Sequence, residues 1–298
     1  ASKQGYNALV RSFPGAGATP ATVVVQGEPA AMSAGVARLE QALAGAPGFG
    51  HPTSQVSADG KVTLVTVPVS ADALSAQAQG NVRALRRTLV PAAFPAPTTA
   101  LVGGAPAENL DYTQTMDYWL PIVFVFVLGL SFLLLMVAFR SLVVSATAIV
   151  LNLLSVGAAY GLLVLVFQKG WLAGFLGFQQ VATIEPWVPL FLFAVLFGLS
   201  MDYQVFLLSR IRERFSATGD NADAVGFGIT STARLITGAA LIIVAVFSGF
   251  AAGEMVMFQQ MGFGVAVALL IDATVVRTVL VPASMKLLGQ RNWYLPRV

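Results

Sequence analysis

The feature that most constrains this chain is an uncharged run of 21 residues, Trp119 to Phe139, which ends at Arg140. A helix needs about 20 consecutive apolar residues to cross the hydrocarbon core of a bilayer, so this run predicts a transmembrane helix. The chain has only 10% charged residues and a mean hydropathy of +0.76, whereas a soluble domain has about 25% charged residues. These values exclude a soluble cytosolic enzyme and a disordered chain, and the absence of cysteine excludes a disulfide scaffold.

Four further apolar runs have the length of a membrane span. The second span is broken only by the neutral Asn152, the third contains one charge, Asp202, and the fifth contains Asp272 and Arg277. We therefore predict an α-helical membrane domain over residues 119–284, followed by a tail over residues 285–298. Its five spans are residues 119–139, 142–167, 187–208, 236–252 and 258–281.

The basic residues between the spans predict an orientation, because cytoplasmic loops are rich in Lys and Arg. One side of the membrane receives almost all of them, and the other receives only Lys169, near Glu185 and Glu254. The C-terminus is then cytoplasmic and residues 1–118 lie outside, in a multi-pass protein of a bacterial cytoplasmic membrane. The alternative is an inverted topology, with residues 1–118 inside. The basic side holds Arg140, Arg210, Arg212, Arg214, Arg234, Lys286, Arg291 and Arg297.

A domain outside the membrane needs an upstream segment to carry it across. Ala1 opens into polar sequence, with no charged n-region and no apolar h-region before the domain. We therefore expect this chain to be the C-terminal part of a larger polypeptide, or one product of a split one.

Residues 20–104 predict a small α+β domain. Strands, helices and the turn Ala58-Asp59-Gly60 follow one another in the order β-α-β-β-α-β, which is the ferredoxin-like arrangement. Residues 108–119 contain neither Gly nor Pro and are expected to continue as helix into the first span. The expected strands are 22–26, 53–57, 62–69 and 99–103, and the expected helices are 32–44 and 81–89.

The polar residues of this domain do not indicate an enzyme. His51 has no partner at metal-ligand spacing, and no nucleophile–base pair or phosphate loop is present. Arg83, Arg86 and Arg87 form a basic helix face, either solvated or in contact with anionic lipid or substrate. The net charge of +3 is small and its arginines adjoin apolar runs, so it indicates membrane anchoring and not nucleic acid binding. We expect no metal and no cofactor.

Three ionisable residues within the spans need an explanation, because charges there are costly and usually face a bundle interior or a water path. Arg277 is close to the cytoplasmic end of its span and is expected to snorkel. At 1.5 Å per residue, Asp202 and Asp272 lie at similar depth, about 22 and about 21 Å from the outer ends of their spans. Thr274 and Thr278 are the polar groups expected to hold Asp272 if that residue is structural.

Asp202 has the surroundings of a proton-binding group. Tyr203 follows it, and Gly198 and Ser209 share its helix face, where small residues let a second helix or water approach. Apolar surroundings raise the pKa of a carboxylic acid toward neutrality, where it can take up and release a proton. The alternative is an Asp202 held permanently by a hydroxyl or amide of a neighbouring helix.

Two segments resemble signatures of a known family. Residues 198–213 (GLSMDYQVFLLSRIRE) and 262–277 (GFG through LLIDATVVR) are similar to motifs of the MMPL family, within the RND superfamily of proton-driven exporters. The chain resembles the C-terminal half of such a transporter, from its second external domain onward. The resemblance implies two similar halves whose Asp-Tyr pairs cross-bond in the membrane, with the proton as coupling ion. Asp202 and Tyr203 match the second pair, and Asp272 with Thr274 and Arg277 falls in the last-span motif.

The expected function is export of lipid-like or drug-like amphiphiles, with the N-terminal half as partner in the same or a separate chain. Membrane lipids, other envelope proteins and a second copy are further possible partners. One alternative is a non-transporting accessory subunit that binds an envelope protein through residues 1–118. Another is an intramembrane aspartyl protease, but the Gly-x-Gly-Asp motif expected there is replaced by Leu270-Ile271-Asp272-Ala273.

Two loops between spans carry their own predictions. Residues 171–178 (WLAGFLGF) are too short to cross the membrane and predict either an interfacial helix or a loop packed on the bundle. Residues 221–232 predict a separate short helix on the cytoplasmic side.

Overall fold

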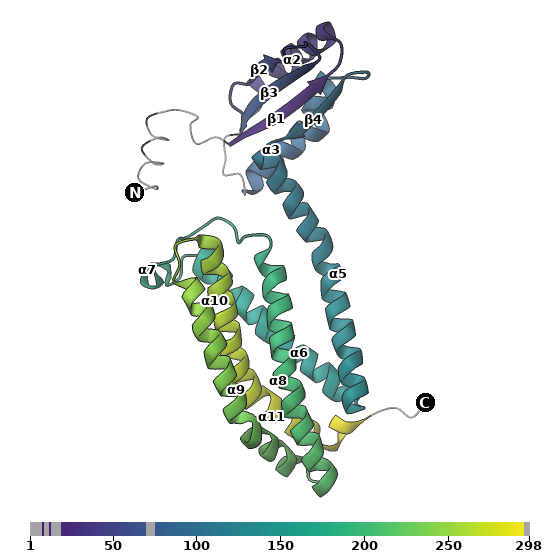
Figure 1. Cartoon of the computed structure of the whole chain (residues 1–298), viewed down its shortest axis with the longest axis vertical. Coiled ribbons are helices and arrows are strands. Elements are labelled where there is room, and N and C mark those ends of the chain that lie inside the picture. The colour runs from purple at the N-terminus through teal and green to yellow at the C-terminus, as the bar shows by residue number, and fades with distance from the viewer. Residues whose placement is uncertain (1–7, 9–11, 13–18, 70–74, 295–298) are drawn as a thin grey trace. The chain divides into compact units, whose positions relative to one another are not determined.

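The computed structural model describes residues 8, 12, 19–69 and 75–294, and the chain divides into two compact units. The first unit, Ala1–Thr115, contains a sheet and its helices, and the second, Met116–Val298, is a bundle of long helices (Figure 1). Helix α5 (Ala105–Phe139) begins in the first unit and continues without a break in the second, as expected from the sequence.

The first unit is built on a four-stranded antiparallel sheet. The strands are β1 (Thr19–Gln26), β2 (Thr53–Val56), β3 (Val62–Val69) and β4 (Thr99–Gly103). Their order across the sheet is β2-β3-β1-β4, so β1 lies between β3 and β4 and β2 is an edge strand. This is the ferredoxin-like topology predicted from the sequence.

The sheet has a core-facing side because its strands alternate between buried and open positions. Val23 and Val25 of β1 and Val65 and Val67 of β3 are fully buried. Helix α2 (Pro29–Ala44) contributes Leu39 and its buried neighbours to the same core. The second helical segment is longer than predicted and consists of α3 (Ala76–Ala84), the π-helix η1 (Leu85–Leu89) and α4 (Val90–Ala93).

The turn between β2 and β3 is closed by Asp59. Its carboxylate accepts hydrogen bonds from the Ser57 hydroxyl at 2.6 Å and from the Lys61 backbone N–H at 3.2 Å. Gly60 has a φ of 68°, which a residue with a side chain seldom adopts. The Ser57 hydrogen bond, followed by that of Lys61, lowers the pKa of the Asp59 carboxyl.

The second unit contains five helical segments, among the described residues, that are long and apolar enough to cross a membrane. This confirms the five predicted spans. Helix α5 is the first, and α6 (Leu142–Leu163) with the π-helix η2 (Val164–Gln168) is the second. The others are α8 (Val188–Thr218), α9 (Asn221–Ala251), and a composite of α10 (Val256–Ile271), η3 (Asp272–Leu280), α11 (Val281–Leu288) and the 3-10 turn η4 (Gly289–Trp293).

The prediction of a separate helix over residues 221–232 is wrong, because these residues are the first turns of α9. Asp220 caps the helix by accepting from the backbone N–H groups of Ala222 and Asp223. Gly228 lets α9 approach α8 closely, since a Cβ built there would lie 2.3 Å from Ile211 Cγ1. The amphipathic segment therefore packs on α8 and remains continuous with the span.

The loop at residues 171–178 contains only one helical turn, α7 (Ala173–Leu176). Phe178 stacks on Phe167 with ring centroids 4.9 Å apart, so this end of the loop packs on the bundle. Phe175 is 87% exposed and stacks on no aromatic ring in the described part of the chain.

The bundle has two hydrophobic cores separated along the helix axes. One core surrounds Ala148, Leu207 and Val276, and it lies toward the end that carries Arg140 and Arg210, which we call the arginine-rich end. The other core is built from residues further from that end, among them Val156, Phe197 and Leu269. Between the two cores, α6, α8 and η3 contribute a set of buried polar side chains.

Candidate functional site

Four polar side chains form a buried layer between the two hydrophobic cores. Asn152 comes from α6, Ser200 from α8, and Asp272 and Arg277 from η3. Their exposed fractions are between 3% and 5%. Buried polar groups are stable only when they bond to one another or to water, so we treat this layer as the candidate site.

Asp272 and Arg277 form the centre of the layer. Arg277 donates to Asp272 Oδ2 through Nη2 at 2.7 Å and through Nε at 2.9 Å. The Ser200 hydroxyl lies 2.9 Å from the same oxygen. Among the described residues no group donates to Oδ1, so the second carboxylate oxygen keeps its lone pairs for a proton. Removing one partner of such a buried pair typically costs about 3–5 kcal/mol of stability.

The helical geometry of η3 brings these two residues together. Asp272 and Arg277 are five residues apart, which in an α-helix is about 1.4 turns and puts them on different faces. The segment is instead a π-helix, whose hydrogen bonds join residues five apart. Residues at that spacing lie one above the other, so the acid and the base meet on one face. Short π-helical segments within α-helices occur frequently at functional sites.

Ser200 connects the ion pair to α6. Its hydroxyl contacts both Asn152 Oδ1 and Asp272 Oδ2, but it has only one proton to donate. The Nδ2 of Asn152 has no partner within the described part of the chain. If the Asn152 carboxamide is turned by half a revolution, Nδ2 donates to Ser200 and the Ser200 proton is left for Asp272. The layer therefore has two hydrogen-bond arrangements that differ in how well they stabilise the charged carboxylate.

Arg277 also contacts α8 through Ser200 and Tyr203. Its Nη2 donates to the Ser200 carbonyl oxygen at 2.7 Å, and its guanidinium carbon lies 4.9 Å from the centre of the Tyr203 ring. Nη1 is buried and has no hydrogen-bond partner among the described residues. Nη2 also lies 3.1 Å from the Ser200 hydroxyl oxygen. The cation is thus held by one carboxylate, one carbonyl, one hydroxyl and one aromatic face, all from α8 or η3.

Asp202 lies outside this layer, although it is adjacent to Tyr203 in sequence. Its side chain is exposed and makes no hydrogen bond or ion pair with any residue that the structure describes. Gly198 and Ser209 are exposed on the same helix, and no atom lies within 4 Å of a Cβ built on Gly198. This face of α8 is therefore uncovered in the second unit.

Two expectations about the last span are wrong. Arg277 does not snorkel toward the membrane surface, because its side chain is 4% exposed and bonded to Asp272. Thr274 and Thr278 do not hold Asp272: both are exposed, and their hydroxyls donate to backbone carbonyls of their own helix, those of Leu270 and Thr274. The groups that hold Asp272 are Arg277 and Ser200.

One arginine of the basic helix face predicted in the first unit, Arg86, forms contacts that hold the fold together. Arg86 donates to the Val102 carbonyl oxygen at 3.0 Å and pairs with Asp111 of α5. Among the residues that the structure describes, Arg83 bonds only to Gln79 of its own helix. Arg297, which contributes to the predicted orientation, lies outside the described residues.

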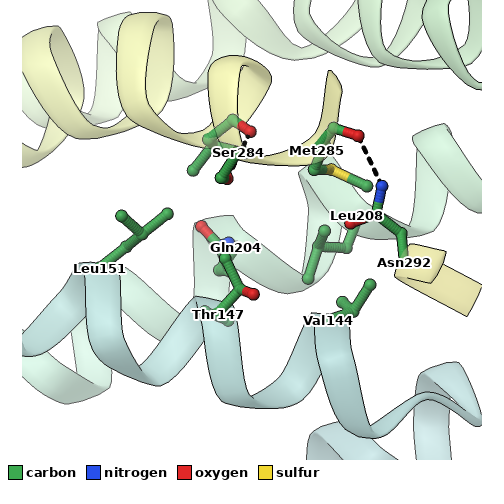
Figure 2. A pocket seen from close by; sticks show the side chains of 10 residues that line it. Val144, Thr147, Leu151, Gln204, Leu208, Ser284, Met285 and Asn292 are labelled. Carbon is green, nitrogen blue, oxygen red and sulfur yellow. Dashed lines mark hydrogen bonds between the residues drawn. The ribbon is translucent and has the colours of Figure 1, made fainter. Parts of the chain in front are cut away.

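A small cavity lies beside the polar layer, toward the arginine-rich end, between α6, α8 and α11. It has about 10 Å³ of space for the centre of a water molecule, enough for about one water. Figure 2 shows Gln204 and Thr147 on one side of it and Ser284 and Met285 on the other.

The sequence alone did not indicate a role for Gln204, Asn152 or Ser200. The available signal was their spacing, because Ser200 and Gln204 are four residues apart on one helix face.

The sequence model of the MMPL family matches residues 3–298. The chain belongs to the MMPL family. Together with the five spans, this membership makes it a multi-pass bacterial membrane protein. The Asp202–Tyr203 motif and the polar layer are therefore features of an MMPL membrane domain.

Several named MMPL proteins are similar to this chain. It is 44% identical over 242 residues to the mycolic acid-containing lipids exporter MmpL11 of Mycolicibacterium smegmatis. The aligned region is 81% of this chain and 25% of that protein. It is 49% identical over 196 residues to the heme uptake protein MmpL11 of Mycobacterium tuberculosis H37Rv, covering 66% and 20%. Identity to the trehalose monomycolate exporter MmpL3 of Mycobacterium tuberculosis CDC 1551 is 39% over 199 residues, covering 67% and 21%. The matched regions are a quarter or less of the length of these relatives.

Proposed function

We propose that this chain is the C-terminal half of a proton-driven MMPL transporter that moves lipid-like amphiphiles outward across the cytoplasmic membrane. The family match supports a transporter and not an enzyme. The printed names of two relatives describe export of mycolic acid-containing lipids or trehalose monomycolate. They support a lipid-like substrate, and the drug-like substrates considered from the sequence have no such support.

The observation that carries the proposal is the buried ion pair of Asp272 and Arg277. An acid and a base in the interior of a transmembrane bundle are costly to maintain and typically mark a proton or ion path. Here the acid has one oxygen, Oδ1, free for a proton, while Oδ2 accepts from Arg277 and Ser200. The site therefore has the chemistry of a proton-binding group with a defined charged state.

Protonation of Asp272 changes the forces on Arg277. A proton on Oδ1 removes the negative charge opposite a guanidinium that remains protonated at any physiological pH. The buried cation then loses its ionic attraction to Asp272, and its other contacts are the Ser200 carbonyl and hydroxyl oxygens and the Tyr203 ring, all on α8. One proton moving through 100 mV supplies about 2.3 kcal/mol to drive a shift of η3 against α8.

We assign Asp202 to the interface with the other half of the transporter. Its face of α8 is uncovered in this unit, and the family resemblance implies a second Asp-Tyr pair that cross-bonds with Asp202 and Tyr203. Tyr203 contacts Arg277, so a rearrangement at that interface reaches the Asp272 pair through one side chain. Gly198 and Ser209, which flank Asp202 on this face, would allow the close approach.

The distribution of basic residues supports the orientation of the proposed transporter. The arginine-rich end is cytoplasmic, residues 1–118 lie outside, and the proton enters from outside and leaves to the cytoplasm. Helix α5 is one continuous element from Ala105 to Phe139. A movement of the bundle is then passed along this helix toward the external domain, where the amphiphile is released.

The test uses the whole transporter in proteoliposomes that contain the pH dye pyranine and a fluorescent acyl lipid. Asp272→Asn and Asp202→Asn should each reduce proton flux and lipid movement by about 100-fold or more, the effect of losing a proton-transfer group. The matched control is Asp223→Asn, which removes a surface carboxylate that pairs with Arg214. Full activity of Asp272→Asn would refute the proton site. If neither the parent protein nor its variants move lipid, that result would favour the accessory-subunit alternative.

A further inference from the structure

The cavity between α6, α8 and α11 contains polar groups without partners. The side chain of Gln204 is 6% exposed and makes no hydrogen bond to any described residue. Thr147, half-buried on the neighbouring helix α6, has no hydrogen bond either within the described part of the chain. A buried carboxamide has two donors and an acceptor to satisfy, and a cavity of this size admits about one water. Water is therefore the ligand that these residues fit.

The cavity lies next to the polar layer. Gln204 follows Ser200 by one helical turn on the same face of α8, and side chains at that spacing are about 5–6 Å apart at Cβ. One water molecule spans such a gap with a hydrogen bond to each side chain. Ser200 in turn contacts Asp272 Oδ2. The cavity thus adjoins the proposed proton site.

The other end of the cavity reaches polar groups at the arginine-rich end. Asn292, which lines the cavity, donates to the carbonyl oxygen of Met285 at 2.6 Å (Figure 2). It also donates to the carbonyl oxygen of Gly289 at 2.7 Å. Asn221, at the start of α9, donates to the same Met285 carbonyl at 2.9 Å. Polar groups therefore continue from the cavity to the first turn of α9.

We infer that water held by Gln204 and Thr147 forms the cytoplasmic arm of the proton path, and that Gln204 is its positioning residue. This inference rests on the proposed function. In the step from the layer to the cavity, the protonated carboxyl group of Asp272 first turns by half a revolution about its Cβ–Cγ bond, so that its O–H faces the Ser200 hydroxyl, which contacts the Oδ2 position. The O–H bond of Asp272 then breaks and its proton binds to the Ser200 oxygen. The Ser200 hydroxyl proton passes to the cavity water, and a proton leaves that water, past Asn292, for bulk water on the cytoplasmic side. Each oxygen gains one proton and loses one, and Asp272 returns to the carboxylate that pairs with Arg277.

The test replaces Gln204 with methionine, whose side chain has the same length but no amide group to form hydrogen bonds. In proteoliposomes of the whole transporter with trapped pyranine, Gln204→Met should reduce proton flux by about tenfold, the effect of losing one hydrogen bond on the path. Gln204→Glu keeps a hydrogen-bonding group, so it should retain flux and add an acidic ionisation to the pH profile of the flux. A purely structural role for Gln204 would not produce that change in the pH profile.

The matched controls separate this inference from the proposed function. Thr147→Val should lower proton flux several-fold, whereas Thr232→Val should not, because Thr232 is a buried threonine bonded to its own helix at Gly228. If Gln204→Met and Thr147→Val retain parental flux while Asp272→Asn abolishes it, the water path is refuted and the proton site stands. If Asp272→Asn also retains flux, the proposed function fails as well.

Discussion

The Asp272–Arg277 pair makes a quantitative prediction for a double-mutant cycle. Asp272→Leu leaves a guanidinium that cannot lose its proton, in a site where the arginine side chain is 4% exposed. That change should cost about 3–5 kcal/mol of stability. Arg277→Met should cost less, because the Asp272 carboxylate left behind can take up a proton and become neutral.

The double variant Asp272→Leu/Arg277→Met removes both charges and fills the site with apolar groups of similar volume. Its stability should lie close to that of the parent, or above it by up to about 4 kcal/mol. The coupling energy between the two positions is then about 3 kcal/mol or more, well above the roughly 0.5 kcal/mol within which independent sites add.

The assay is equilibrium unfolding of the whole transporter in mixed detergent micelles, together with lipid movement in proteoliposomes. The double variant should fold as well as the parent and transport nothing, because the pair is required for proton coupling and not for the fold. Additive effects of the two single changes would refute the buried pair. Transport by the double variant would refute its role in coupling.

Three further predictions concern other parts of the chain. Gly262→Ala should destabilise the bundle by about 1–3 kcal/mol, because the added Cβ would lie 2.4 Å from the Ala251 nitrogen. Gly129→Ala is the control and should not destabilise it, because there is open space around Gly129. Equilibrium unfolding in detergent measures both changes. Tyr203→Phe keeps the ring that faces Arg277 and should impair lipid movement less than the loss of Asp202. Ser57→Ala removes the main hydrogen bond that lowers the pKa of Asp59, so a carboxyl NMR titration should give a higher Asp59 pKa in this variant than in the parent.

The Asp59 prediction has a definite sign. A lowered pKa in the folded state means that the turn gains stability from the carboxylate above the unfolded value of about 3.9, and loses it as the pH falls through the lower folded value. In Ser57→Ala the acid-dependent loss should therefore be smaller. A titration that moves the Asp59 pKa downward in this variant would contradict the assignment of the hydrogen bond.

Much of the fold can be predicted from local patterns. Alternating valines in residues 62–69 and the Ala58-Asp59-Gly60 turn predict the β2–β3 hairpin, because period two and a flexible glycine are local signals. The five spans follow from length and hydropathy. The boundary between residues 221–232 and the fourth span is harder to predict. The amphipathic segment and the span form one continuous helix because both pack on α8, and the local sequence pattern does not show this shared neighbour.

The candidate site is less accessible to sequence reasoning. The pairing of Asp272 with Arg277 depends on η3 being a π-helix, and α-helical periodicity puts these residues on different faces. Ser200 and Asn152 are uncharged, so within apolar spans they carry no obvious signal until the structure places them beside Asp272. Asp202 stands out in the sequence because it is charged, yet no residue that the structure describes bonds to its side chain.

The most direct test of the central claim is infrared difference spectroscopy of the whole transporter in lipid, recorded on acidification of the outer side. The account predicts a carbonyl band from a newly protonated carboxylic acid, which is lost in Asp272→Asn and persists in the surface control Asp223→Asn. A band that is unchanged in Asp272→Asn, or no protonation signal under conditions where lipid is transported, would contradict it.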